Sequence, residues 1–195
     1  MSGPRPPSDF HRRIPDVLAL PAGSRLHRFY TAGYDPIFFD RSRSGRFGSP
    51  NGRYGVLYAA MTEAGAFAET FLRTPGRTLI DPAFLRKKAY ARLTVGTPLR
   101  LVRLCGPAMA KIGATAEVAH GGLPYDVPQI WSESIEAHPI RSDGIAFHAR
   151  HDDAELCCAI FDRVAASIVE EKRIVDLDQD WFWSLAARYG VGFAP

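Results

Sequence analysis

The sequence predicts a single α+β domain, with a mixed or antiparallel β core flanked by helices. Stretches typical of strands outnumber stretches typical of helices, and several of the strands are hairpin-like. The chain contains no Gly-x-Gly-x-x-Gly and no Walker sequence, which disfavours a Rossmann fold and a P-loop NTPase. We expect residues 1–23, which are rich in proline, to form an irregular arm, and residues 24–195 to form the domain.

The first predicted elements surround a long loop. Alternating apolar and polar residues predict a strand at 25–31, and a short apolar stretch predicts another at 54–59. The loop between them, 32–53, is long for a compact domain, which is typical of a functional or a disordered segment. Thr62 can cap the helix that follows, with Glu63 favourable in its first turn. Further along, the sequence predicts helices at 82–88, 107–112, 128–137 and 178–188, and strands at 89–95, 98–104, 143–149, 155–161 and 166–174.

The composition excludes several classes of protein. An apolar content of 46% with 23% charged residues is ordinary for a soluble globular protein, and no apolar run approaches the length of a membrane span. The N-terminus has no apolar signal core. Three cysteines without metal-type spacing indicate reduced thiols, and neither a disulfide framework nor a zinc site. We therefore expect a cytoplasmic protein without a metal ion.

Positive charge is concentrated in the loop 32–53. Four arginines lie there, and no acidic residue follows Asp40. Fixed positive charge beside flexible, glycine-rich backbone is suited to hold an anion, most economically a phosphate. Aromatic residues around the loop could stack on a ring, so phosphate and ring together suggest a nucleotide. The plainer interpretation is a solvated basic face. The four arginines are Arg41, Arg43, Arg46 and Arg53.

Three further residues are candidates for chemistry, and each has a plainer interpretation. Glu69 lies at the border of an apolar helix stripe, where it could simply form an exposed pair with Arg73. Arg28 alternates with apolar residues along a predicted strand, so an inward position would require a carboxylate or a bound phosphate as its partner. Ser132 has no Gly-x-Ser-x-Gly around it, which does not support a hydrolase nucleophile, although its hydroxyl could donate to a sugar.

Four segments of the chain occur in the order found in a known family. They read LHRFY, SGRFGSPNGRYGVLYAA, AFAETFLR and QIWSESIEAHPIRSDGIAFHARHD, and together they cover about residues 25–163. In these segments the chain resembles the RES-domain family, named for an arginine, a glutamate and a serine. The resemblance implies a fold like that of ADP-ribosyltransferase toxins, NAD+ as substrate with no further cofactor, and the toxin role in a bacterial RES/Xre-type toxin–antitoxin system.

The resemblance also implies roles for particular residues. The family's arginine falls on Arg28 or Arg46, its tyrosine on Tyr58, its glutamate on Glu69 and its serine on Ser132. We expect catalysis to depend on Glu69, Arg46 and Ser132, and we expect no metal to take part. The residues expected to bind NAD+ are Arg28, Phe29, Tyr30, Arg46, Phe47, Tyr58 and Ser132.

The residues and the resemblance agree on one hypothesis, an enzyme that cleaves the nicotinamide–ribose bond of NAD+. The acceptor of ADP-ribose stays open between water, phosphate and a protein side chain, which makes the enzyme an NAD+ glycohydrolase or phosphorylase, or a mono-ADP-ribosyltransferase. Its expected partners are NAD+, a cognate antitoxin and a possible protein target, with no membrane.

Two alternatives belong to other functional classes. One is a non-catalytic module whose basic loop docks an acidic protein or a nucleic acid. The other is a regulator that binds NAD+ or ADP-ribose and leaves both intact. A nucleic-acid surface ranks third among the interpretations of the uneven charge, after a solvated face and a basic cleft for an anionic ligand. The basic residues do not extend along a helix or alternate with aromatic residues over a long stretch.

Overall fold

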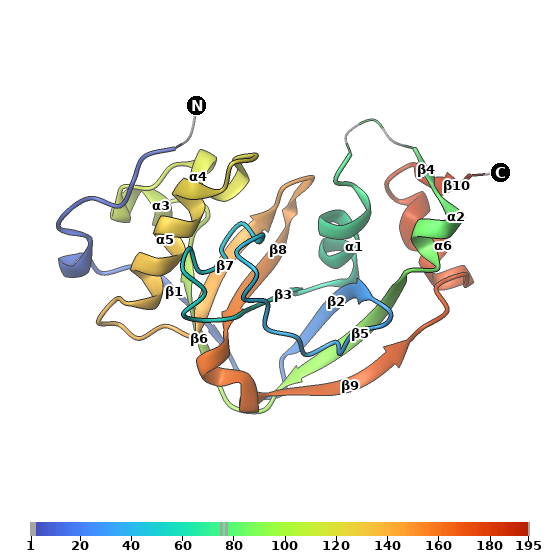
Figure 1. Cartoon of the computed structure of the whole chain (residues 1–195), viewed down its shortest axis with the longest axis horizontal. Coiled ribbons are helices and arrows are strands. Elements are labelled where there is room, and N and C mark those ends of the chain that lie inside the picture. The colour runs from blue at the N-terminus through green and yellow to red at the C-terminus, as the bar shows by residue number, and fades with distance from the viewer. Residues whose placement is uncertain (1–2, 75, 77, 195) are drawn as a thin grey trace.

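The chain folds around an eight-stranded sheet, which confirms an α+β domain with a mixed, mostly antiparallel core (Figure 1). The computed structural model describes residues 3–74, 76 and 78–194. The strands are β1 (Val17–Leu20), β2 (Arg25–Thr31), β3 (Val56–Ala60), β5 (Lys88–Val95), β6 (Leu99–Arg103), β7 (Gly144–Ala149), β8 (Asp152–Phe161) and β9 (Ile168–Ile174), with β4 (Leu79–Ile80) and β10 (Gly192–Phe193) in a separate parallel ribbon. The order in the sheet is β1-β6-β7-β8-β3-β2-β5-β9, in which β6 and β7 are parallel and the other neighbours antiparallel.

Helices cover the two ends of the sheet in two groups. Figure 1 shows α3, α4 and α5 gathered over the part that contains β1, β6 and β7, while α1, α2 and α6 lie over the part that contains β2 and β5. Thr62 caps α1 as expected, since its hydroxyl oxygen accepts a hydrogen bond from the Gly65 amide. The helices are α1 (Glu63–Phe71), α2 (Pro82–Leu85), α3 (Ala108–Ile112), α4 (Ala116–His120), α5 (Asp126–Glu136) and α6 (Asp180–Ala187), with short 3₁₀ turns at Phe10–Arg12 and Asp162–Ser167.

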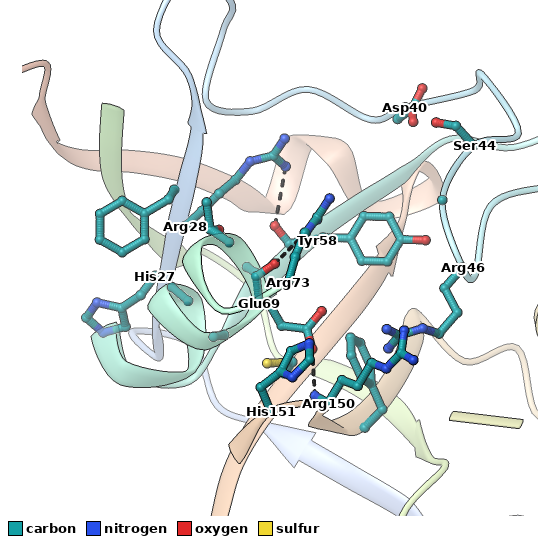
Figure 2. A pocket seen from close by; sticks show the side chains of 18 of the residues that line it. His27, Arg28, Asp40, Ser44, Arg46, Tyr58, Glu69, Arg73, Arg150 and His151 are labelled. Atoms are coloured by element: carbon teal, nitrogen blue, oxygen red, sulfur yellow. Dashed lines mark hydrogen bonds between the residues drawn. The ribbon is translucent and has the colours of Figure 1, made fainter. Parts of the chain in front are cut away.

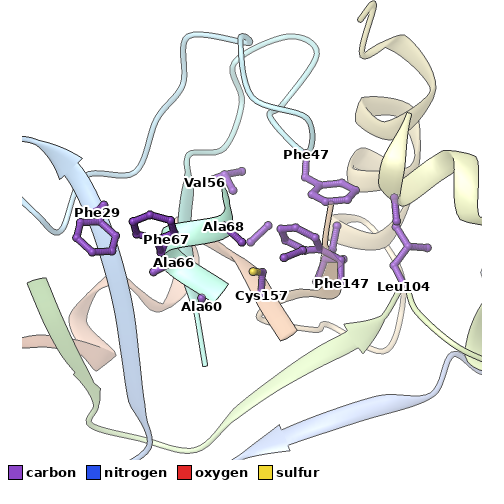
Figure 3. Close-up of a cluster of buried hydrophobic side chains, with 14 of the residues drawn as sticks. Phe29, Phe47, Val56, Ala60, Ala66, Phe67, Ala68, Leu104, Phe147 and Cys157 are labelled. Carbon is purple, nitrogen blue, oxygen red and sulfur yellow. The ribbon is translucent and has the colours of Figure 1, made fainter. Parts of the chain in front are cut away.

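Two apolar cores hold the sheet. The larger lies between the sheet and the helices, and it buries Trp131 of α5, Phe67 of α1 and Phe147 of β7. Figure 3 shows Phe67 beside Phe29 on one side of this cluster and Phe147 beside Phe47 on the other, with Ala68 of α1 between them. The second core lies on the other face of the sheet and is built from strand residues such as Leu26 and Ile160. Since both faces are covered, the sheet is a rigid frame for the loops at its edges.

The sheet has a seam between β2 and β3. These strands share one residue pair, His27 with Ala60, whereas β2 pairs with β5 along its whole length. Beyond that pair the strands separate, and the Arg28 guanidinium meets the Tyr58 carbonyl at an Nη1–O distance of 3.4 Å. The seam therefore opens the sheet at its centre, where side chains from both strands can reach a shared space.

The expectation of an irregular arm over residues 1–23 is wrong for Val17–Leu20, which form β1 and pair with β6. The prolines near this segment dominated the prediction, but its apolar side chains find a partner strand and Leu20 becomes buried. Two further residues of the arm pack on α5, since Trp131 donates a hydrogen bond to the Pro4 carbonyl (Nε1–O 2.7 Å) and contacts Phe10 edge-on.

Candidate active site

A cavity of about 440 Å³ opens at the seam, between β2, β3, α1 and the turn from β7 to β8. Its volume falls in the range typical of small-molecule sites. Figure 2 shows four arginines around it, with two carboxylates. Positive charge is therefore in excess, which favours an anionic ligand. The charged residues are Arg28, Arg46, Arg73 and Arg150, with Asp40 and Glu69.

Arg28 is a half-buried cation at the cavity. Its guanidinium donates to the Tyr58 carbonyl, and among the residues that the structure describes it forms no ion pair. Burial lowers the pKa of Arg28 to about 10, and the distant Asp40 offsets this only in part. A charged group held out of water in this way is stabilised when an anion binds beside it.

Arg46 is directed into the cavity by aromatic rings. Its guanidinium carbon lies 6.0 Å from the ring centroid of Tyr125 and 5.9 Å from that of Phe147, within the range of cation–π contacts. Its Nε is buried and has no hydrogen-bond partner within the described part of the chain. The outer nitrogens face the cavity in Figure 2, which leaves them available to a ligand.

The loop that carries Arg46 is anchored on one face of α5. Gln129 donates to the carbonyl oxygens of Arg43 and Gly45, at 2.7 and 3.0 Å. One turn further along, Glu133 accepts a hydrogen bond from Arg53 at 3.2 Å. Positions separated by three or four residues share a helix face, so α5 presents a row of polar groups to the loop. The loop is long but held in place.

Ser132 belongs to this same row and does not line the cavity. Its side chain is fully buried, it donates to the Phe47 carbonyl (Oγ–O 2.6 Å), and it accepts from the Tyr54 hydroxyl at 2.9 Å. The Ser132 hydroxyl, which we expected to contact a sugar, therefore faces the loop backbone and Tyr54 and not the cavity. Its position instead fixes the backbone next to Arg46.

Glu69 points its carboxylate into the cavity. Its Oε1 accepts a hydrogen bond from the backbone amide of Arg150, at 2.8 Å, in the turn between β7 and β8 (Figure 2). Arg73 donates to the Glu69 carbonyl oxygen and not to its carboxylate. The alternative of an ordinary exposed pair with Arg73 is thus wrong. An amide that holds one carboxylate oxygen fixes the charge in place and leaves the other oxygen to the cavity.

Tyr58 forms the wall between Arg28 and the loop. Its hydroxyl oxygen accepts a hydrogen bond from the Phe47 amide at 2.7 Å, and burial raises the pKa of its phenol. Gly45 lies directly against this hydroxyl, because a Cβ placed there would come within 2.6 Å of it. The glycine is required by this close approach.

We expect Gly45→Ala to lower the free energy of unfolding by about 1–3 kcal/mol, since the added methyl group must displace Tyr58 or the loop. Denaturant unfolding measures the change. Gly33→Ala, in the same loop, is the matched control, because a Cβ at Gly33 meets no atom within 4 Å. Equal denaturant midpoints for Gly45→Ala and Gly33→Ala would contradict the close approach of residue 45 to the Tyr58 hydroxyl.

A match to the RES domain covers residues 23–183 of the chain. The chain belongs to the RES-domain family. Among solved structures, this RES domain is similar to a chain of the crystal structure of the M. tuberculosis MbcT–MbcA toxin–antitoxin complex. The TM-score is 0.62, with 14% sequence identity, over 87% of this chain and 92% of that chain. At this identity the likeness concerns the fold. None of the curated proteins matches the chain.

Of three aromatic residues expected to bind NAD+, two lie outside the cavity of this RES domain and one lies at its border. Tyr30 lies in the second core, behind the sheet, and Phe47 is fully buried against Phe147. Phe29 borders the cavity, but its ring packs into the larger core and stacks on Trp181 at a centroid distance of 6.3 Å. The structure brings together Arg28, Arg46, Tyr58 and Glu69, and leaves Tyr30, Phe47 and Ser132 outside the cavity.

Several cavity residues escaped the sequence analysis. Arg150 and His151 form the turn between two predicted strands, and this position could have marked them as neighbours of a site. Burial lowers the pKa of His151, with a contribution from Arg150. Tyr125, beside Arg46, comes from a segment for which no element was predicted, and only the folded chain brings it there.

Some of the expected absences can be compared with the structure. Across residues 3–74, 76 and 78–194, no group of three or more His, Cys, Asp or Glu side chains is placed to hold a metal ion. None of the helices in that part of the chain has the length and apolar character needed to cross a membrane. Cys157 borders the cavity, but burial raises the pKa of its thiol, which makes it a poor nucleophile.

Proposed function

We propose that this RES domain cleaves NAD+ between nicotinamide and ribose and passes ADP-ribose to water, phosphate or a protein side chain. One observation carries the proposal: a fixed carboxylate, Glu69, shares a cavity with two guanidinium groups, Arg28 and Arg46, that form no ion pair with any residue the structure describes. Within the described residues, the cavity thus offers charges of both signs at separate positions. A dinucleotide has a matching distribution, with an anionic pyrophosphate and a cationic nicotinamide ring.

In this proposal the arginines bind and the glutamate stabilises charge. Arg28 and Arg46 hold the pyrophosphate through charge-assisted hydrogen bonds. The C1′–N bond of the nicotinamide riboside then breaks, and its electron pair leaves with nicotinamide, which departs neutral without a proton donor. Positive charge develops on the ribose, as in glycoside cleavage, and Glu69 stabilises it. The acceptor oxygen forms the new bond to C1′ and, when it is water, releases a proton.

We further propose that the protein is a cytoplasmic toxin that a cognate antitoxin protein neutralises. The family membership and the fold shared with a chain of a toxin–antitoxin complex support this role. A partner that covers the cavity mouth would block NAD+ without any change in the fold. Co-expression with the neighbouring open reading frame tests this role, since growth arrest should be relieved only when the partner is present.

The enzymatic proposal is tested by mixing purified protein with NAD+ and measuring nicotinamide by chromatography. Three parallel reactions contain buffer alone, inorganic phosphate, or a cell extract, and products are assigned as ADP-ribose, phosphorylated ADP-ribose or labelled protein. Nicotinamide should appear in at least one reaction. If NAD+ stays intact in all three, the proposal is wrong. Salt-sensitive binding without turnover would then favour a docking module for acidic partners.

A further inference from the structure

The turn that holds Glu69 is itself held from the C-terminal end of the chain. Arg150 supplies the amide that binds the Glu69 carboxylate, and Asp152 begins β8 two residues later. The Asp152 Oδ2 accepts a hydrogen bond of 2.7 Å from the hydroxyl of Tyr189, just after α6. The other carboxylate oxygen accepts from the Ala154 amide at 3.2 Å. Both carboxylate oxygens of Asp152 thus accept a hydrogen bond, which holds the turn between β7 and β8 in place.

Tyr189 also contacts the helix that carries Glu69. Its hydroxyl lies 3.3 Å from the Ala64 carbonyl oxygen in the first turn of α1. Its ring stacks on Phe67, with centroids 5.4 Å apart and an interplanar angle of 5°. One side chain therefore touches both elements that meet at Glu69, namely α1 and the turn from β7 to β8.

The charges around Tyr189 keep its hydroxyl a donor. Burial, together with the hydrogen bond to Asp152, raises the pKa of Tyr189, so the phenol stays protonated at neutral pH. The Arg188 Nη2 lies 3.8 Å from the Asp152 Oδ2 and 3.2 Å from the Glu155 Oε1, so its positive charge offsets the negative charge of the two carboxylates.

We propose that Tyr189 is a positioning residue for Glu69, which it orients through Asp152 and the Arg150 amide. The expected effect of Tyr189 on catalysis rests on the proposed function, whereas its effect on the position of the turn does not. Tyr189 lies beyond residues 23–183, the part that matches the RES domain.

The test uses Tyr189→Phe, which removes the hydroxyl and keeps the stacked ring. We expect kcat for nicotinamide release to fall about tenfold, since displacement of a reacting group by about 1 Å costs up to about 10²-fold. The KM for NAD+ should change less than about twofold, because Arg28 and Arg46 are untouched. Tyr34→Phe, with a 66% exposed side chain, is the control and should match wild type in both constants.

A second readout does not depend on turnover. Hydrogen exchange of the Arg150 amide should become about tenfold faster in Tyr189→Phe, while the amide of Leu93 in β5 keeps its protection. Unchanged exchange at Arg150 would overturn the inference, even in a protein that consumes NAD+. Faster exchange in a protein that releases no nicotinamide would instead count against the proposed function alone.

The Asp152 variants cover the case in which Tyr189→Phe does not fold. Asp152→Asn keeps an acceptor oxygen for Tyr189 and should retain both the Arg150 protection and most of kcat. Asp152→Ala removes the acceptor and should lose both. Equal protection of the Arg150 amide in the two variants would overturn the inference.

Discussion

Glu69→Gln should reduce nicotinamide release about 10²- to 10³-fold at saturating NAD+, the range seen when one preorganised group is removed from a transition state. The amide has the shape of the carboxylate, and its oxygen can still accept the hydrogen bond from Arg150. The change therefore removes the charge and keeps the geometry. Because the proposed function assigns NAD+ binding to the arginines, the KM for NAD+ should stay within about threefold. Steady-state kinetics with chromatographic detection of nicotinamide measures both constants.

The control for this prediction is Glu117→Gln on α4, which neutralises a fully exposed carboxylate away from the cavity. It should leave kcat at the wild-type value. Thermal unfolding should give similar midpoints for both variants, since the Glu69 side chain is only half-buried. If Glu69→Gln retains kcat within about threefold, the carboxylate does not stabilise the transition state, and the proposed mechanism is wrong.

Arg28→Met should weaken catalysis and stabilise the folded protein at once. Burial lowers the pKa of Arg28 to about 10, so the charged form of this side chain is disfavoured in the fold. Because the folded state disfavours this charge, an apolar side chain of similar length should raise the free energy of unfolding, by about 1–3 kcal/mol. The loss of charge-assisted bonds to the pyrophosphate should lower kcat/KM about 30- to 100-fold.

Arg25→Met on the same strand is the matched control. Arg25 is exposed and pairs with Glu171 at 3.3 Å, and such surface pairs contribute little to stability. Its variant should therefore keep kcat/KM and unfold with nearly the wild-type midpoint. Denaturant unfolding measures the free energy of unfolding of both variants, and NAD+ kinetics on the same samples measures their kcat/KM. A destabilised Arg28→Met protein with normal kcat/KM would show that the guanidinium serves the fold and not a ligand.

The strand at 25–31 and the helix after Thr62 could be predicted because local patterns determine them. Alternation placed Arg28 on an ordered strand, and the helical period placed Glu69 at the edge of a buried stripe. Their convergence in one cavity could not be predicted in this way. It depends on the seam between β2 and β3, which arises when two strands separate after one pair, and no local pattern in either strand indicates that separation.

Errors in the predicted site come from the same source. The serine of the family motif was expected to touch a sugar, yet Ser132 turns toward the loop backbone and is fully buried. Tyr30, in the LHRFY segment, was expected to bind NAD+, but its side chain lies in the second core. Arg150 was missed because its contribution is a backbone amide, which residue type does not indicate.

The short strands show a different limit. β4 and β10 have two residues each, too few for any periodicity, and they exist only because distant parts of the chain meet. The arm was judged by its prolines, although Val17–Leu20 carry enough apolar surface to extend a sheet. Local propensity was overridden in both cases by long-range pairing.

The contacts of residues 3–20 with the sheet and with α5 determine where the chain can be shortened without loss of structure. The family match starts at residue 23, but the cooperative folding unit starts earlier, since β1 covers the outer edge of β6 and Phe10 closes the core beside Trp131. A fragment trimmed to the homologous segment would uncover that edge and loosen α5. Because α5 anchors the arginine loop, shortening the chain at one end would disturb ligand recognition at the centre of the sheet.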